Sequence, residues 1–253
     1  KHCGLDRRDP WRKSHHLPGL PPFDLLLPVR VNEQRKKLSK RRDPVSIEEF
    51  QAKGYLPEAL RNWLVRIGWS HGDDEIFSSD EIISLFGLEA VGRSSAQADP
   101  DKLLWLNQHY LKAMAQDPLL AALDPFLMEL AGSPAPRTPE FTRLVDLLRE
   151  RSQTLAEMAE KALFAVAEEI SMDAKAVKKH LKPACLPILE SLEQELGQLS
   201  SWNESEMGNA FETVRLKQGD VSMGKLAQPI RVAVTGTSVS PGIYETLEAL
   251  GKE

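Results

Sequence analysis

The stretch GYLPEALRNWLVRI at residues 54–67 decides the fold expected of this chain. Leu60, Leu64 and Ile67 recur on one helical face, a spacing that predicts an amphipathic helix. Pro57 suits the first turn of that helix, because a proline there gives up an N–H that would have no partner. Apolar residues keep a helical period over most of the chain beyond this stretch, and the alternation typical of a sheet is nearly absent. The sequence therefore predicts a mainly α protein.

Helix-boundary signals surround this stretch on both sides. Ser46 followed by Glu49 forms a capping box, which places a helix start at the serine. Asp99 and Pro100 supply an N-cap and a first-turn proline for the next strong pattern. A segment rich in proline and serine at residues 132–139 then interrupts the helical period.

Two long amphipathic stripes follow the interruption. One runs over residues 144–170 and the other over residues 177–196, and Pro183 and Pro187 bend or break the second. Such stripes are typical of the core of a helical bundle. The tryptophans that lie beside leucines in the helical patterns are interpreted as core residues.

The bulk composition is that of a globular protein with one or two domains. Of 253 residues, 42% are hydrophobic and 27% charged, and no apolar run approaches the roughly 20 residues of a membrane span. Two cysteines, Cys3 and Cys185, are too few for a disulfide framework, so a reducing compartment is expected. We therefore predict a cytoplasmic protein with no membrane contact.

Charge is distributed unevenly along the chain. Residues 1–45 carry 12 Lys and Arg against 5 Asp and Glu, while the remainder carries 20 against 32. A basic end beside an acidic body favours an anionic partner such as phosphate or nucleic acid, and a solvated arm is the alternative. Five prolines break every candidate helix in residues 1–30, and the histidines and cysteine there match no familiar zinc spacing. No metal site is predicted.

A basic loop precedes the first helix. Six of the eight residues at 35–42 are cationic, and Lys37 and Lys40 bracket Ser39. Lysine ammonium groups on flexible stems suit mobile phosphate oxygens, which makes this a candidate phosphate-binding loop. Basic clusters of this length also occur as solvated patches or nucleic-acid contacts, so the loop alone does not decide between these interpretations.

Several motifs in order resemble glutamate–tRNA ligases, which are class I aminoacyl-tRNA synthetases. The resemblance covers roughly residues 31–253. The matching motifs are KLSKR at 37–41, GYLPEAL at 54–60, WSHG at 69–72, EIFS at 75–78, DKLLWLN at 101–107, GKLAQPIRVAVTG at 224–236 and SPGI at 240–243.

The resemblance implies a division of the chain. Residues 31–115 would hold the signature loop and a stem-contact helical domain, and residues 116–253 an all-helical anticodon-binding domain. Residues 1–30 would be an irregular leader or a remnant of the catalytic domain. The family's Rossmann-type catalytic domain lies upstream of the signature loop, and nothing in this chain matches it.

The resemblance also implies roles for individual residues. Lys37 and Lys40 would be the catalytic signature-loop lysines, and with Ser39 they would contact the phosphates of ATP, with magnesium in the intact enzyme. The positions that match those used near the tRNA anticodon are Arg231, Ser240, Pro241 and Ile243.

A purely structural interpretation of Ser240 remains open. Ser240 as N-cap and Pro241 at the first position would start a helix over residues 242–250, which Gly251 would end. Both interpretations can hold at once.

The expected function is the tRNA-binding part of a glutamate–tRNA ligase that is inactive on its own. In the intact enzyme, which is expected to be a monomer, the partners would be ATP, glutamate and a glutamate-accepting tRNA. The alternative is a non-catalytic tRNA-binding or interaction module derived from such a ligase.

Overall fold

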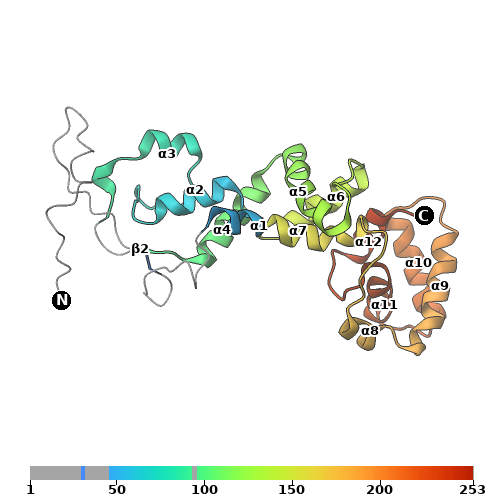
Figure 1. Ribbon diagram of the computed structural model, residues 1–253. Coiled ribbons are helices and arrows are strands. Elements are labelled where there is room, and N and C mark those ends of the chain that lie inside the picture. The colour runs from blue at the N-terminus through green and yellow to red at the C-terminus, as the bar shows by residue number, and fades with distance from the viewer. Residues whose placement is uncertain (1–29, 32–45, 93–95, 253) are drawn as a thin grey trace.

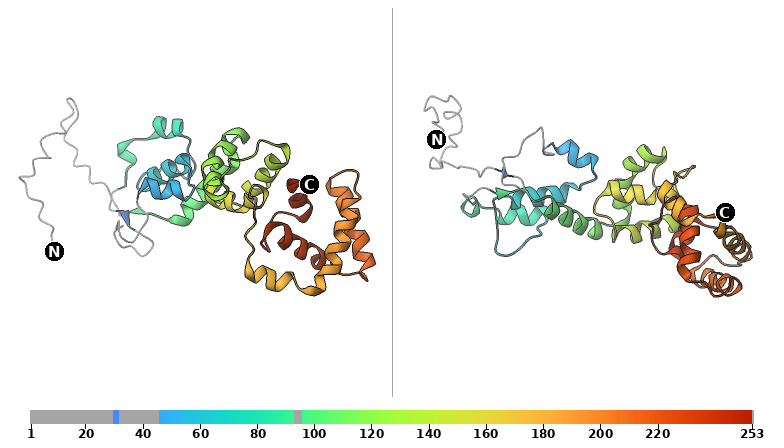
Figure 2. Two further views of the ribbon diagram at one scale, coloured as in Figure 1. Left: turned by 45° about the vertical axis from the view of Figure 1, so that its right-hand side comes forward. Right: turned by 90° about the horizontal axis from the view of Figure 1, so that it is seen from below.

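The computed structural model of the protein describes residues 30–31, 46–92 and 96–252. Within these ranges the chain is built almost entirely of helices, which confirms the predicted mainly α class. The helices follow one another along an elongated body, with α1–α4 at one end and α8–α12 at the other (Figure 1). Two further directions of view show the same elongated arrangement (Figure 2).

The elements have the following bounds. The α-helices are α1 (Ile47–Ala52), α2 (Pro57–Arg66), α3 (Ser79–Leu85), α4 (Pro100–Ala113), α5 (Gln116–Ala131), α6 (Pro139–Arg149), α7 (Leu155–Ala162), α8 (Ala174–His180), α9 (Leu186–Gly197), α10 (Glu204–Lys217), α11 (Met223–Thr235) and α12 (Ile243–Leu250). Short 3-10 turns are η2 (Leu88–Ala90), η3 (Leu163–Ala165) and η4 (Pro183–Cys185). The strands β1 (Arg30–Val31) and β2 (Ala96–Gln97) pair in parallel, with Arg30 opposite Ala96.

The predicted helix starts are confirmed by their hydrogen bonds. The Ser46 hydroxyl accepts from the Glu49 amide, and the Glu49 carboxylate accepts from the Ser46 amide. Ser78 and Glu81 form the same reciprocal pair at the start of α3. The Asp99 carboxylate accepts from the first amides of α4. Each cap satisfies backbone donors that the helix itself leaves unpaired.

The apolar stripe over residues 144–170 is divided between two helices. α6 ends at Arg149, and α7 begins after Thr154, whose hydroxyl accepts from the Glu157 amide at 3.2 Å. The apolar period continues across this break because both helices face the same core. The break expected near Pro183 is present, since α8 ends at His180 and α9 begins at Leu186.

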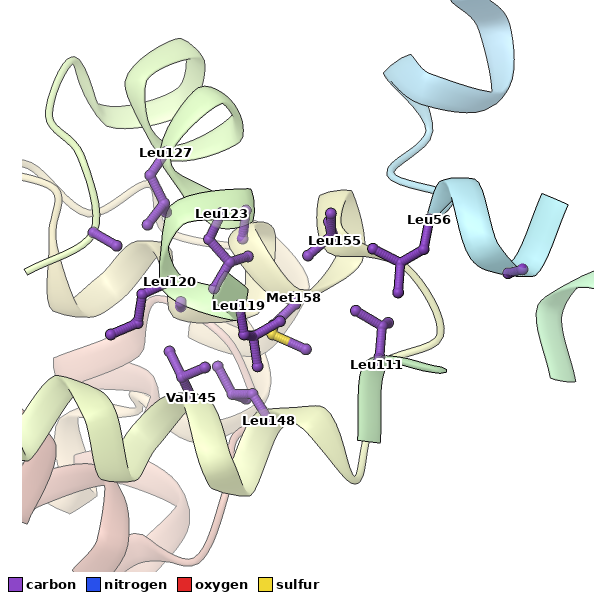
Figure 3. Packing of buried hydrophobic residues seen from close by; sticks show 14 of the residues in the cluster. Leu56, Leu111, Leu119, Leu120, Leu123, Leu127, Val145, Leu148, Leu155 and Met158 are labelled. Atoms are coloured by element: carbon purple, nitrogen blue, oxygen red, sulfur yellow. The ribbon is translucent and has the colours of Figure 1, made fainter. Parts of the chain in front are cut away.

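The helices enclose two apolar cores. The first extends from Leu56 on the α1–α2 turn to Phe164 in η3 and involves α2 and α4–α7. In Figure 3 the labelled leucines of α5 and α6 converge on Met158 of α7. Trp63 lies in this core, as expected of a helical tryptophan beside leucines. Trp69 is also buried. Trp105 is exposed, so the interpretation as a core residue is wrong for it, and the Lys102 ammonium lies 4.1 Å from its ring centre.

The second core lies within α9–α12. Its centre is Phe211 of α10, which is fully buried and meets Tyr244 edge to face. α12 belongs to both cores: Leu247 packs in the second, while Ala249 and Leu250 pack against the first. This helix is therefore a shared wall between the two halves of the molecule.

A buried amide ties three segments of the first core together. The Asn107 side chain on α4 accepts from the Leu56 amide at 2.7 Å and donates to the Gln153 carbonyl. Leu56 precedes α2, and Gln153 lies between α6 and α7. Asn107 and Leu56 are both buried, so the Leu56 amide has no access to water as an alternative partner, whereas Gln153 is exposed.

We expect Asn107→Ala to lower the free energy of unfolding by about 1–3 kcal/mol, because it leaves the buried Leu56 N–H unpaired. Urea denaturation of both proteins measures the difference. Gln108→Ala is the matched control, since its neighbouring amide makes only an exposed 3.4 Å bond to Glu150. Equal losses in the two variants would contradict the role given to Asn107.

Candidate nucleic-acid interface

The three residues of the predicted phosphate loop, Lys37, Ser39 and Lys40, lie outside the described residues. The other predicted site residues lie on α11, on the α11–α12 loop and at the start of α12.

Arg231 joins α11 to the loop that precedes α12. One guanidinium nitrogen of this half-buried side chain donates to both the Ser240 hydroxyl and the Pro241 carbonyl. Burial, followed by the nearby charge of Arg151, lowers the pKa of Arg231 below its ordinary value. We call Arg231, Ser240 and Pro241, with Thr246 behind them, the Arg231 corner.

Ser240 is bonded within this corner and does not cap α12. Its hydroxyl lies 2.9 Å from the Thr246 hydroxyl and 3.0 Å from the Pro241 carbonyl. The N-cap of α12 is Gly242, whose amide donates to the Glu245 carboxylate at 2.7 Å. The interpretation of Ser240 as an N-cap is therefore wrong, because Glu245 satisfies the free amide at this helix start. The predicted end of α12 at Gly251 is correct.

The structure brings three of the four predicted residues into direct contact and places the fourth beneath them. Pro241 is buried, and Ile243 packs into the second core at 7% exposure. Ile243 therefore anchors the α11–α12 loop to the second core. Ser240 is only partly buried, and Val239 beside it is 78% exposed, so this part of the loop faces solvent.

A further residue reaches the corner from the other half of the molecule. Arg151, between α6 and α7, donates to the Ser240 carbonyl at 3.4 Å. No sequence signal pointed to this contact, because 89 residues separate the partners and Arg151 stands in no recognisable motif. The corner thus lies at the junction of the two cores, with guanidinium groups from both sides.

A hollow of about 390 Å³ adjoins the loop between Gly236 and Ser240. It is lined by apolar and hydroxyl groups such as Phe164 and Thr237, and also by the charged residues Glu160, Lys161 and Asp173. Gly236 at φ 74° approaches Ser171 so closely that a Cβ would lie 2.2 Å from its carbonyl oxygen. Only glycine fits there, because both the backbone angle and the space exclude a side chain.

The Arg231 corner is suited to binding a polar ligand. It holds a half-buried planar guanidinium and the partly buried Ser240 hydroxyl beside the solvent-facing Val239, and such groups can recognise the exposed edges of unpaired bases. Among the described residues there is no cluster of His, Cys, Asp and Glu side chains that could hold a metal ion. None of the helices in the described ranges is long and apolar enough to cross a membrane.

Two family models match the chain. The model for an anticodon binding domain matches residues 118–253, and the model for the catalytic domain of class I tRNA synthetases (E and Q) matches residues 19–105. The Arg231 corner lies in the first of these matches, and α1–α3 with the first part of α4 lie in the second. The expectation that nothing in this chain matches the family's catalytic domain is therefore wrong, since the catalytic-domain model matches part of it.

Curated relatives and solved structures agree with these matches. The glutamate–tRNA ligase of Geobacter sulfurreducens is 43% identical over 227 residues, which are 90% of this chain and 48% of the relative. Glutamate–tRNA ligase 1 of Syntrophus aciditrophicus is also 43% identical, over 228 residues. The crystal structure of a glutamate tRNA ligase from Elizabethkingia meningosepticum in complex with its amino acid superposes with a TM-score of 0.75 at 26% identity, covering 89% of this chain and 48% of that one.

The chain thus spans about half the length of the curated relatives it matches. The anticodon-binding match covers more than half of the chain and includes the corner built by Arg231. The protein belongs to the glutamate–tRNA ligase family of class I aminoacyl-tRNA synthetases and carries that family's anticodon-binding domain.

Proposed function

We propose that this chain is the tRNA-binding part of a glutamate–tRNA ligase, which attaches glutamate to tRNA at the expense of ATP. The observation that carries the proposal is the Arg231 corner, a solvent-edged set of directional donors and acceptors inside the anticodon-domain match. The whole enzyme would take ATP, glutamate and a glutamate-accepting tRNA. It would act as a monomer in the cytoplasm.

The corner would read anticodon bases through edge contacts. One guanidinium nitrogen of Arg231 is engaged internally, and the Arg231 side chain is held rigid by its two acceptors. A rigid donor discriminates between bases more sharply than a mobile one, because a mismatched base then leaves a polar group unpaired. Ser240 and Pro241 would shape the edge of the site, and Ile243 would hold it in place from the second core.

We also propose a division of labour along the chain. Residues 31–115 would contact the tRNA stem and carry the signature loop, and residues 116–253 would contact the anticodon. The anticodon-domain match over residues 118–253 supports the second assignment, whereas the match over residues 19–105 is to a catalytic domain. In the whole enzyme, Lys37 and Lys40 with Ser39 would bind ATP phosphates and stabilise charge on the pyrophosphate leaving group. This assignment rests on the motif KLSKR alone.

The chain by itself is expected to bind glutamate-accepting tRNA, with affinity that falls steeply as salt rises, and to show no glutamate-dependent exchange between ATP and pyrophosphate. Filter binding and the exchange assay measure these two properties. The complete ligase of Geobacter sulfurreducens serves as the positive control for exchange. Clear exchange by the chain alone would overturn its assignment as a non-catalytic part, and tRNA binding that ignores salt would overturn the proposed interface.

The rival proposal is a module that binds tRNA without belonging to a catalytic polypeptide. Sequencing the genomic DNA upstream of Lys1 distinguishes the two, because a ligase requires an encoded nucleotide-binding domain there.

We expect Arg231→Lys to reduce discrimination between the cognate anticodon and a substituted one by roughly 10-fold, since lysine keeps the charge but loses the planar fork. Dissociation constants for the two tRNAs measure this ratio. Arg215→Lys on α10 is the control, because Arg215 pairs with Glu212 away from the corner. An unchanged ratio in Arg231→Lys would count against base reading by Arg231.

A further inference from the structure

The lysines of this acidic chain differ in whether they form an ion pair with a carboxylate. Among the described residues, the lysines of α4, α7 and α10 form ion pairs with acidic partners: Lys102 with Glu75, Lys112 with Glu150, Lys161 with Glu157, and Lys217 with Glu195. These pairs leave little charge to act on a ligand.

A second group of lysines on and just after α8 has no such partner. Lys175, Lys178, Lys179 and Lys182 are all exposed, and none of them lies within ion-pair distance of a carboxylate among the described residues. Lys175, Lys178 and Lys179 stand three and four positions apart, so they share one helical face. We call these four residues the α8 lysine cluster.

The segment that contains the cluster has no acidic residue between Asp173 and Glu190. Residues 174–189 contain four lysines and no Asp or Glu, and residues 221–244 contain Lys225 and Arg231 and again no Asp or Glu. The rest of the chain from residue 46 onward holds 14 cationic residues against 32 acidic ones. Two cationic segments thus stand out within a strongly acidic body.

The fold brings these two segments together. α8 packs against α11, the helix that carries Arg231 (Figure 1). The backbone amide of Asp173, the N-cap of α8, donates to the Gly236 carbonyl at 2.9 Å, which ties α8 to the loop that leads to Ser240. Asp173 and Val239 both line the hollow beside that loop. The helix that carries most of the lysine cluster therefore packs beside the helix and loop that build the Arg231 corner.

Like charges held together without counter-charges favour a ligand that carries several negative charges at regular spacing. A polynucleotide backbone has this chemistry, and lysine ammonium groups bind its phosphates as point charges without reading sequence. The neighbouring corner suits exposed base edges. One RNA strand could then place its bases at the corner and its phosphates over α8.

From this arrangement we infer that the α8 lysine cluster is a phosphate-binding surface for the backbone of the anticodon arm of tRNA, separate from the base-reading corner. The inference rests on the proposed function. It divides the work of the anticodon domain, because the corner supplies selectivity and the cluster supplies affinity that does not depend on sequence.

The test compares tRNA binding by the full chain and by K178Q/K179Q across a salt series. Each lost phosphate contact should lower the steepness of log affinity against log salt by about 0.7–0.9, so the double variant should lose about 1.5 and bind roughly 30-fold more weakly at 0.1 M salt. K112Q/K217Q removes the same charge from paired lysines and should keep the wild-type slope. Circular dichroism and the thermal midpoint confirm that all three proteins fold alike.

A second measurement separates backbone contacts from base reading. Substituting an anticodon base should weaken binding by the same factor in the wild type and in K178Q/K179Q, because phosphate contacts are insensitive to sequence. A changed factor, a wild-type slope in K178Q/K179Q, or an equal loss in K112Q/K217Q would overturn the inference and leave the proposed function standing. A wild-type chain that binds no tRNA would overturn both.

Discussion

The continuous first core is the constraint on which the rest of the structure depends. It extends without interruption from Leu56 to Phe164, so α2, α4, α5, α6 and α7 move as one packed unit. Close packing of this kind fixes the helices relative to one another, because side chains in a core have few alternative arrangements. The buried amide of Asn107 reinforces it by holding the starts of α2 and α7 to α4.

The second core takes its position from the first through α12 and the contacts around it. Arg143 on α6 pairs with Glu248 on α12, and the Trp202 indole donates to the Leu247 carbonyl at 2.8 Å. The Arg231 corner lies at this junction and receives Arg151 from the first half. The geometry of the corner therefore depends on how the two halves are joined.

The helical class, the helix starts at Ser46, Pro57 and Asp99 and the motif order could be read from the sequence, because caps and apolar periods are local signals. The break at Thr154 was hidden, since the apolar stripe continues in phase on either side of it. The contact of Arg151 with Ser240 was also hidden, because it depends on tertiary packing between distant segments. Ser240 was open to two interpretations. In the structure the N-cap of α12 is Gly242, whose amide donates to the Glu245 carboxylate. The phosphate loop lies outside the described residues and stays a prediction.

The uneven distribution of charge affects how an RNA would approach the molecule before any contact forms. Most of the surface beyond residue 45 belongs to an acidic body, while exposed and unpaired lysines gather beside α11. A polyanion approaching the acidic side is repelled, and one approaching α8 is attracted, over about a Debye length. The chain therefore has one face that attracts polyanions and other faces that repel them. Unproductive encounters separate quickly, and the surviving ones already have the corner turned toward the nucleic acid.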